Sequence, residues 1–562
     1  IVYAGEYMGI LTRYDRSTGH ARSIAVWPEE YSGHGAKEYK YRFQWTYPII
    51  LSPHDPNILY VGGNHVFKST DEGEHWTAIS PDLSWNDPAT LEPSGGPITK
   101  DNTGAEVYGT VFTLAESPVQ PGVLWAGTDD GRLHVTRDGG ATWTEVTPPD
   151  LPERALMSIV EASPHDPAVA YLAATRYKHD DFRPYLFKTA DYGQTWTKIT
   201  GGIPEHDFTR VIREDPRRRG LLYAGTETGI YVSFDDGVNW HRLGGDLPAV
   251  PVHDLVIKDS DLDVATHGRS FWILDDITLL RQLAEQREHD STLRLFAPRE
   301  TVRWGRMPSF GLEPVKGLNY AFAATQIPAY DYEKTPDGEV KIRWLDAGTN
   351  PPDGVMIHYA LATEVDEIKL EILDASGAAI RTVTSSKEKP EVEEEPPQFP
   401  PEVEERELIE EKPYLSRKAG LNRFVWNLRP DDAAKIEGKG GDKPSRTGPR
   451  VPPGEYQVRV TVGNETRTAS FRVVKDPRVT ATQDQLQEQY ALCMRLHRKH
   501  DELNKAVNRI RALRQQAEDW ARRAKGAEGG EEIIEAARKL KEKLDAIEGE
   551  LLQVKIESPQ DS

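Results

Sequence analysis

Cysteine is almost missing from this chain of 562 residues, which contains Cys493 and no other. A single thiol excludes an intrachain disulfide and any metal site built on several cysteines. Long apolar runs are missing as well, since no stretch approaches the ~18 residues that a membrane-spanning helix needs. We therefore expect no disulfide framework and no membrane insertion.

Positive charge is in the minority, with 69 Lys and Arg against 90 Asp and Glu and a formal net charge of −21. Such a surface repels the phosphates of nucleic acids and of anionic lipids. The sequence also lacks His-Glu-x-x-His, Gly-x-Ser-x-Gly and a phosphate-binding glycine loop. The segment that starts at Asp259 resembles a calcium loop, but Val264 and Ser270 replace its glycine and glutamate. We expect no nucleic-acid partner, no cofactor and no resident metal.

An eight-residue pattern, Ser/Thr-x-Asp-x-Gly-x-x-Trp, occurs four times in the first half, starting at Ser69, Thr136, Thr189 and Ser233. Its Asp can accept hydrogen bonds from turn amides, its Gly suits a left-handed backbone, and its Trp can pack between neighbouring sheets. A metal or sugar site is the alternative interpretation, and we favour the structural one. The residues assigned this structural role are Asp71, Gly73, Trp76, Asp138, Gly140, Trp143, Asp191, Gly193, Trp196, Asp235, Gly237 and Trp240.

The spacing of the pattern suits β-propeller blades, because a blade of four short strands takes roughly 40–50 residues. Residues 1–18 read as one more blade and residues 262–274 as another, which gives about six. A strand near 293–296, or sequence outside this chain, would complete the ring. The chain starts inside a strand without an initiator Met, so we expect further sequence upstream.

The second half changes character twice. Alternating strands after Val355 suit a small immunoglobulin-like sandwich, interrupted by loops at 386–413 and 434–452 that we expect to be mobile. Two helices are predicted after Asp476, with a break at 526–530. Their apolar residues recur at steps of three and four, which predicts one packing face; these residues are Leu486, Tyr490, Cys493 and Leu496.

The predicted fold class is mainly β: a β-propeller of Asp-box repeats, then an immunoglobulin-like β-sandwich, then a C-terminal α-helical hairpin. The predicted domains are a propeller at 1–300, a connecting segment at 301–354, the sandwich at 355–475 and the hairpin at 476–562. The hairpin could pack on the sandwich, cover the propeller or mediate homo-oligomerisation.

The four motifs resemble the Asp-box superfamily, which includes sialidases, two-propeller xyloglucanases, sortilin (Vps10)-type receptors and photosystem assembly propellers. Four further segments resemble large bacterial proteins labelled glycosyl hydrolase or Vps10/sortilin-like; these are 41–45, 52–56, 174–178 and 265–276. The resemblance covers nearly the whole chain. It implies an extracytoplasmic protein, in the periplasm, on the cell surface or secreted.

In Asp-box enzymes the active site lies on the propeller face opposite the boxes, on the loops that join the second and third strands of each blade. Paired carboxylates there would supply the acid and the base or nucleophile of glycoside hydrolysis. The catalytic candidates are Asp129, Asp130, Asp180, Asp181 and Glu227. The candidate ligand-binding residues are Glu6, Tyr7, Asn64, His65, His179, Arg183, His267 and Arg269. The alternative is ordinary turn chemistry, which Asp129-Asp130-Gly131 also fits.

Two functions stay open from the sequence. The favoured one is a binding or assembly module for protein or glycan partners. The alternative is a sialidase- or xyloglucanase-like glycoside hydrolase, although the Arg-Ile-Pro segment of sialidases is absent and only one propeller is visible. A deep cleft with two carboxylates roughly 5–10 Å apart would favour the hydrolase.

Overall fold

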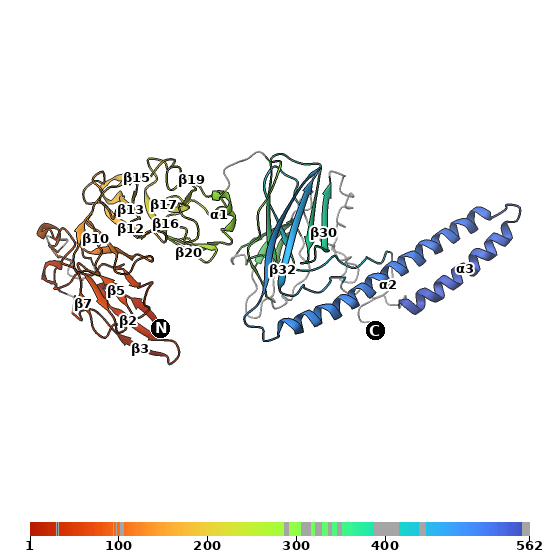
Figure 1. The fold of residues 1–562 in the computed structure, drawn as a ribbon, viewed down its shortest axis with the longest axis horizontal. Helices are drawn as coiled ribbons and strands as arrows, with labels where there is room; N and C mark the ends of the chain where they lie inside the picture. The colour runs from red at the N-terminus through yellow and green to blue at the C-terminus, as the bar shows by residue number, and fades with distance from the viewer. Residues whose placement is uncertain are drawn as a thin grey trace. The chain divides into compact units, whose positions relative to one another are not determined.

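The chain divides into two compact units, Ile1–Arg287 and Glu288–Ser562, in a computed structural model (Figure 1). The residues that the structure describes are 1–29, 31, 33–93, 95–96, 98–101, 106–285, 291–304, 316–320, 329–334, 340–345, 351–386, 415–437 and 446–552. Both units are mainly β, and the second carries the two long helices. Within the described ranges, no helix combines the length and the apolar character that crossing a membrane requires.

The described part of the first unit forms six antiparallel sheets that follow one another along the chain. The first and last have three strands and the other four have four strands. The sheets are β1 (Val2–Gly5), β2 (Leu11–Asp15) and β3 (His20–Ser23); β4 (Ile49–Leu51), β5 (Leu59–Gly62), β6 (Val66–Ser69) and β7 (Thr77–Ala78); β8 (Val111–Glu116), β9 (Leu124–Thr128), β10 (Leu133–Thr136) and β11 (Thr144–Glu145); β12 (Leu156–Ala162), β13 (Ala170–Arg176), β14 (Asp181–Thr189) and β15 (Thr197–Lys198); β16 (Thr209–Glu214), β17 (Leu222–Thr226), β18 (Ile230–Ser233) and β19 (His241–Arg242); and β20 (Val252–Lys258), β21 (Asp261–Thr266) and β22 (Phe271–Leu274). Short 3₁₀ helices lie at Tyr7–Gly9 (η1), Ala36–Glu38 (η2), Pro88–Thr90 (η3) and Tyr177–His179 (η4), and α1 spans Thr278–Glu285.

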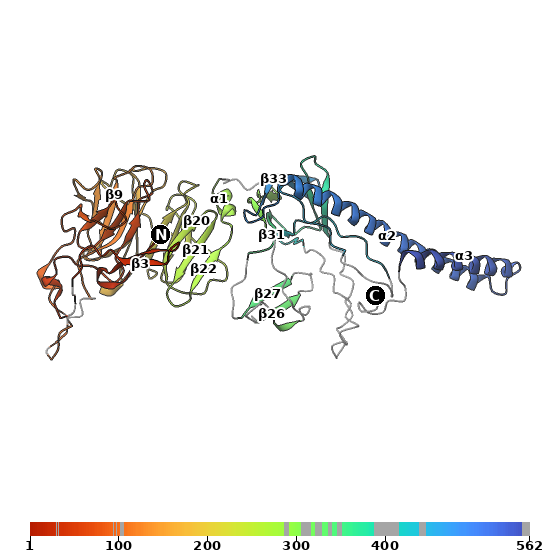
Figure 2. The same cartoon turned by 90° about the horizontal axis from the view of Figure 1, so that it is seen from below.

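The first strands of successive sheets contact one another, β4 with β8, β8 with β12, β12 with β16 and β16 with β20. Figure 2 shows the last sheet, with β20, β21 and β22 side by side. The second strands β9 and β17 are buried along their whole length, because apolar clusters fill the space on both of their faces. Each cluster draws its residues from two neighbouring sheets, as Trp125 of β9 and Leu172 of β13 share one. This is the radial arrangement of a β-propeller, with the first strands innermost.

The four eight-residue motifs join the third strand of a sheet to its short outer strand, and their hydrogen bonds repeat. In each, Asp Oδ1 accepts from the amide four residues later, at 2.8–3.0 Å. Each Trp Nε1 donates to a carbonyl oxygen at the end of the preceding sheet, at 2.7–3.0 Å. The four acceptors are Ile24, Ile79, Val146 and Ile199. The motifs therefore close a turn and also tie adjacent sheets together.

The second unit contains two sheets around one hydrophobic core. They are β23 (Leu293–Leu295), β28 (Val355–Leu361) and β31 (Gly420–Trp426), and β24 (Thr301–Arg303), β33 (Glu465–Lys475), β32 (Gly454–Val462), β29 (Glu367–Leu373) and β30 (Ala379–Ser386). A separate sheet holds β25 (Gly317–Tyr320), β26 (Ala329–Lys334) and β27 (Val340–Trp344).

The strand near residue 293 corrects the sequence analysis. We expected either this strand or sequence outside the chain to complete the propeller ring, but β23 pairs with β28 and Leu293 is fully buried in the sandwich core. Most of the loop expected at 386–413 lies outside the described residues. The start of the loop expected at 434–452 is held against α2, since Ala434 N donates to Asp501 and Glu437 N donates to Asn508.

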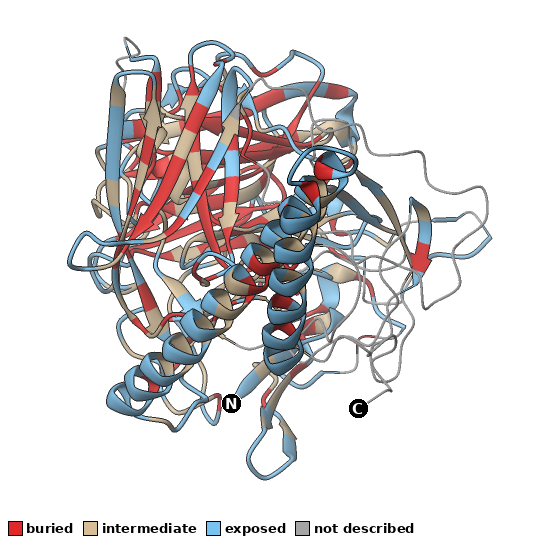
Figure 3. Cartoon of the chain, turned by 90° about the vertical axis from the view of Figure 1, so that its right-hand side faces the viewer, coloured by how far each residue is buried: buried red, intermediate tan, exposed pale blue. Residues whose placement is uncertain are grey.

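The predicted helical pair is confirmed as α2 (Gln483–Ala524) and α3 (Gly530–Leu551). Thr482 and Gln485 form a capping box that starts α2. The predicted packing face holds for Leu486, which is buried, and for Tyr490, which packs on the sandwich core. It is wrong for Leu496, which is 63% exposed, because much of the outer surface of these helices faces solvent (Figure 3).

Candidate functional site at the central cavity

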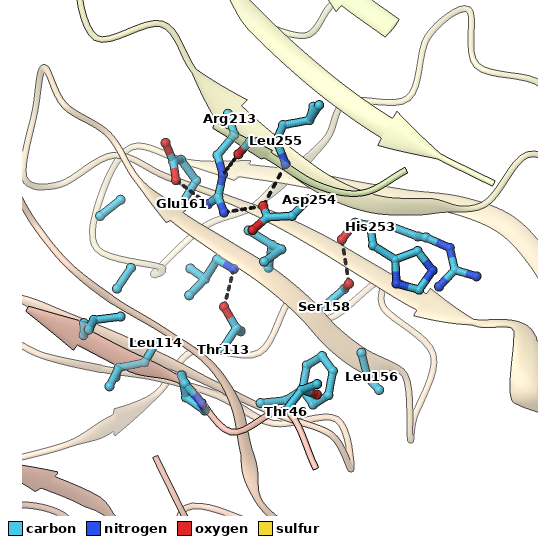
Figure 4. A pocket seen from close by; sticks show the side chains of 18 of the residues that line it. Thr46, Thr113, Leu114, Leu156, Ser158, Glu161, Arg213, His253, Asp254 and Leu255 are labelled. Carbon is cyan, nitrogen blue, oxygen red and sulfur yellow. Dashed lines mark hydrogen bonds and ion pairs between the residues drawn. The ribbon is translucent and has the colours of Figure 1, made fainter. Parts of the chain in front are cut away.

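The innermost strands of the propeller enclose a cavity of about 1110 Å³ (Figure 4). Its walls come from β4, β8, β12, β16 and β20, together with loops that flank them. Apolar side chains such as Leu114, Ile159 and Leu255 alternate there with polar and charged ones. A large concave site with a few converging polar groups is the expected form of a binding site.

The strand register shows at which mouth of the cavity the loops between second and third strands lie, and these loops form the predicted rim. Leu156 at the start of β12 lies opposite Thr175, and η4 follows directly, so Tyr177 and His179 lie at this mouth and line the cavity. The motif turn that starts at Thr189 lies at the other end, because Thr189 is paired with Ala170. The predicted rim and the motif turns are therefore on opposite ends of the sheets.

Asp129 lines the cavity but is 4% exposed. Its Oδ1 accepts from the amides of Gly109 and Thr110 at 2.9 and 2.8 Å, and its Oδ2 accepts from Thr110 Oγ1 and from Gln44 Nε2. Burial raises the pKa of Asp129 to about 6, since these hydrogen bonds only partly offset the loss of water and Asp130 adds a like charge. The carboxyl therefore keeps its proton to a higher pH than an ordinary aspartate does.

Asp130 and Asp181 have both carboxylate oxygens engaged. Asp130 accepts from Thr128 Oγ1 and from the amide of Trp85, and burial raises its pKa. Asp181 accepts two hydrogen bonds from the guanidinium of Arg183, which hold its pKa well below the usual range. These partners account for both groups as anchors of their own loops.

Asp180 and Glu227 are more open. Asp180 is exposed at the end of η4, with a φ of 56°. Glu227 Oε2 accepts from Nε and Nη2 of Arg210 at 2.9 and 2.7 Å. Its side chain is 36% exposed, so an oxygen of this carboxylate can meet solvent or a ligand while Arg210 holds the group in place.

The remaining predicted ligand-binding residues divide into internal and accessible ones. Asn64 is buried between Arg42 and Asp82, and His65 bonds to Ser80 O, so these two have structural partners. The accessible ones are Glu6, Tyr7, His179, Arg183, His267 and Arg269.

Among these, Tyr7 stacks near Trp45 with ring centroids 5.1 Å apart. His267 Nδ1 lies 3.3 Å from Nε2 of His253, and His253 lines the cavity. Burial and the neighbouring Arg210 lower the pKa of His253.

Several cavity residues were missed by the sequence analysis, among them Arg154, Arg210 and His253. A second group lies deeper, where Arg213 bonds to Glu161 at 2.8 Å and to Asp254 at 2.7 Å (Figure 4). Burial raises the pKa of Glu161 although Arg213 opposes this. The signal that could have found them is charge on the innermost strands, because strands in a protein core seldom carry charged residues.

Aromatic rings flank the charged groups of the rim. Tyr177 and Phe208 stack with centroids 5.1 Å apart, and the guanidinium of Arg210 lies over both rings. Phe182 is 48% exposed, and its ring centroid lies 6.0 Å from that of Phe208. Exposed aromatic faces beside charged groups suit ligands that have both apolar faces and hydroxyl groups.

Acidic and imidazole side chains do not gather into a metal site in the described part of the chain, where no group of three or more His, Cys, Asp or Glu could hold an ion. The four motif aspartates are satisfied by their own turns. What the described cavity offers is acid–base groups, a guanidinium and aromatic faces.

No family model matches the chain. Among curated proteins it is similar to an oligoxyloglucan-reducing end-specific xyloglucanase of Emericella nidulans, at 24% identity over 184 residues, which is 32% of this chain and 21% of that protein. It is also similar to a xyloglucanase of a Paenibacillus species, at 22% identity over 256 residues, which is 38% of this chain and 22% of that protein. The chain thus spans about a fifth of the length of these relatives.

Among solved structures, the chain is similar to a GH74 xyloglucanase from Xanthomonas campestris, with 14% identity, a TM-score of 0.35 and coverage of 64% of this chain and 62% of that one. It is also similar to PorZ, a surface component of the type-IX secretion system of Porphyromonas gingivalis, with 16% identity, a TM-score of 0.34 and coverage of 84% and 56%. These scores are low, so the propeller is inferred above from its own sheets and cavity.

Proposed function

We propose that this chain is part of an extracytoplasmic, glycoside hydrolase-like β-propeller protein that acts on a polysaccharide at the rim of its central cavity. The sequence similarity to xyloglucanases supports this proposal and makes xyloglucan oligosaccharides the first substrates to test. From the sequence alone we favoured a binding module over a hydrolase, and with this similarity we now favour the hydrolase. The immunoglobulin-like character of the sandwich is a further part of the proposal.

The raised pKa of Asp129 carries the proposal. Glycoside hydrolysis needs one carboxyl group that still holds a proton near neutral pH and a second that is ionised. Burial raises the pKa of Asp129 to about 6 at the cavity wall, which suits the general acid. Glu227, held by Arg210 and partly open, suits the second carboxylate, as base or nucleophile.

Sugar rings would lie against the exposed aromatic faces of the rim. Phe182 offers such a face on one side of the mouth, and Trp45 offers another beside Tyr7. The C–H faces of pyranose rings pack on aromatic surfaces, while hydroxyl groups can bond to Arg154 and His253 at the cavity wall.

The test is a hydrolysis assay on xyloglucan oligosaccharides and a panel of other glycans. The release of reducing ends measures the reaction. Asp129→Asn and Glu227→Gln should each lower kcat by 100-fold or more, in line with the loss of a general acid or base. The matched control is Asp55→Asn, on the loop between β4 and β5 at the opposite end of the second sheet, which should keep full activity. If both Asp129→Asn and Glu227→Gln keep the wild-type rate of turnover, these assignments are overturned.

Binding without turnover is the second candidate function, with a glycan or a protein as partner. The observation in its favour is that Asp129, Asp130 and Asp181 each have both carboxylate oxygens hydrogen-bonded within the protein, which leaves fewer carboxylates open to a substrate. Calorimetric titration of the same oligosaccharides separates the two functions. Glycan affinity that Phe182→Ala weakens, in a protein without turnover, would favour the binding module.

A further inference from the structure

The helical pair of the second unit has two faces of different chemistry. The helices α2 and α3 lie side by side and antiparallel (Figure 1), and Ile510, Ala517 and Ala524 form the buried line of α2. On a helix with 3.6 residues per turn, Arg514 and Glu518 fall on one side of this line. Leu513 and Trp520, which are 40% and 60% exposed, fall on the other side.

The same division occurs on α3 about its buried Leu544. Lys541 and Asp545 fall on one side, and Leu540 and Ile547 fall on the other. The charged sides meet, because Arg514 pairs with Asp545 at 2.7 Å and Lys541 pairs with Glu518 at 2.6 Å. The apolar sides of both helices must therefore share the opposite face of the pair.

This apolar face has the spacing of a helix-bundle interface. Its exposed members recur every seven residues, at Leu513 and Trp520 on α2 and at Ile533, Leu540 and Ile547 on α3. A seven-residue apolar repeat that is left open on two adjacent helices matches one half of a four-helix bundle. Single exposed apolar residues are ordinary, whereas an aligned row on two helices indicates an interface.

The charges of the two helices indicate which partner binds the apolar face and in which orientation. Helix α2 contains nine Lys and Arg against six Asp and Glu, whereas α3 contains four against seven. In a two-fold bundle whose axis runs along the helices, α2 of one copy lies against α3 of the other, so that every adjacent pair has opposite charge. The other two-fold arrangement would place α2 against α2, with like charges together.

We propose that this face is a dimerisation surface, on which the helical pair of a second copy of this chain completes an antiparallel four-helix bundle with α2 against the partner copy's α3. The pairs Arg514–Asp545 and Lys541–Glu518 set the levels along the helices, and a two-fold axis along the helices preserves them. In that arrangement Trp520 of one copy lies near the level of Leu540 of the other, and Leu513 near the level of Ile547. The dimer carries two propellers, each with its own cavity.

Sedimentation equilibrium of the full chain tests the dimer against a monomer mass of 63.2 kDa. Wild type should show twice this mass, and Leu540→Glu/Ile547→Glu should shift it to the monomer. Both positions are exposed, so helix content by circular dichroism should not change. Leu496→Glu, an equally exposed apolar position on α2 ahead of the stretch that pairs with α3, should leave the dimer intact. A wild-type monomer throughout the micromolar range would overturn the proposal.

Disulfide trapping tests the orientation, in a Cys493→Ser background. A Trp520→Cys chain mixed with a Leu540→Cys chain should give cross-linked heterodimers as the main product on oxidation. Cross-linking mainly between two Trp520→Cys chains would indicate α2 against α2 and would overturn the proposed arrangement.

Discussion

The indole nitrogen of Trp240 lies 2.7 Å from the carbonyl oxygen of Ile199, which follows the outer strand of the preceding sheet. Trp240 is 3% exposed, and Gly237 of the same motif also packs against Ile199. A single motif thus uses two of its residues to hold one neighbouring residue. The other three motifs repeat this contact on Ile24, Ile79 and Val146.

Replacing Trp240 by Phe should separate the hydrogen bond from the packing. The variant keeps an aromatic ring but leaves the buried carbonyl of Ile199 without its indole donor, which costs about 1–3 kcal/mol of unfolding free energy. Thermal unfolding of the first unit should shift downward by several degrees. Trp520→Phe, on the exposed face of α2, should not move this transition. Equal shifts for both variants would contradict the role of the hydrogen bond.

Two adjacent glycines of the second motif should tolerate substitution very differently. Both have a positive φ, +71° at Gly139 and +100° at Gly140. A Cβ at Gly140 would lie 2.6 Å from Ile79 O, whereas a Cβ at Gly139 would meet nothing within 4 Å. Gly140→Ala should cost about 2 kcal/mol or more, from left-handed strain and overpacking together.

Gly139→Asp is the matched control, because Asp236 occupies the corresponding position of the fourth motif with a φ of 63°. It should change the unfolding free energy by only about 0.5 kcal/mol. Chemical denaturation of both variants measures the difference. A larger loss at Gly139 than at Gly140 would show that backbone strain, and not the contact with Ile79, decides the outcome.

The repeat made the propeller predictable, because four copies of one turn place the strands on either side of them. The late strand β23 was misassigned because Leu293 and Leu295 are apolar in an alternating pattern that fits either unit. Only the pairing with β28, distant in sequence, decides where the strand belongs. Local pattern predicts a strand, and long-range packing chooses its sheet.

The candidate site was less predictable than the fold. The rim loops were located by topology, yet carboxylates on these loops differ in ways that sequence does not encode: Asp130 is buried and fully bonded, whereas Glu227 is partly open. The deeper charges Glu161 and Arg213 belong to strands that the sequence analysis treated only as structure. Burial and partners, which depend on the assembled ring, set the chemistry of each group.

Stability should depend on pH through Asp129. Burial raises the pKa of Asp129 to about 6, from an ordinary value of 3.8, so the folded state binds the proton more tightly than the unfolded state. The protonated carboxyl costs nothing extra below pH 3.8, and the ionised one costs about 3 kcal/mol once the pH has risen through 6. Stability from this group is therefore lost as the pH rises between these values.

Asp129→Asn should remove that pH dependence. The amide keeps an oxygen for the Gly109 and Thr110 amides, and a rotated Gln44 side chain can accept from its nitrogen. Unfolding free energies measured from pH 4 to 7 should show wild type losing stability relative to the variant as the pH rises. A constant difference between the two proteins would mean that the pKa of Asp129 is not raised.

The network of Arg213 should be the most sensitive point of the cavity wall. Its guanidinium bonds to Glu161, to Asp254 and to the carbonyl oxygen of Leu255, and so connects β12, β16 and β20. Arg213→Met leaves Glu161, a half-buried carboxylate of the cavity wall, without its cation, which should cost about 3 kcal/mol at pH 7. Because removal of the cation raises the pKa of Glu161 further, proton uptake can relieve this cost, and the loss of unfolding free energy should be smaller at pH 5.

The double variant Arg213→Met/Glu161→Gln should recover part of the loss at pH 7 and show little change between the two pH values. If Arg213→Met loses equal stability at pH 5 and pH 7, the guanidinium acts by packing, and the charge of Glu161 is already hydrated in the cavity.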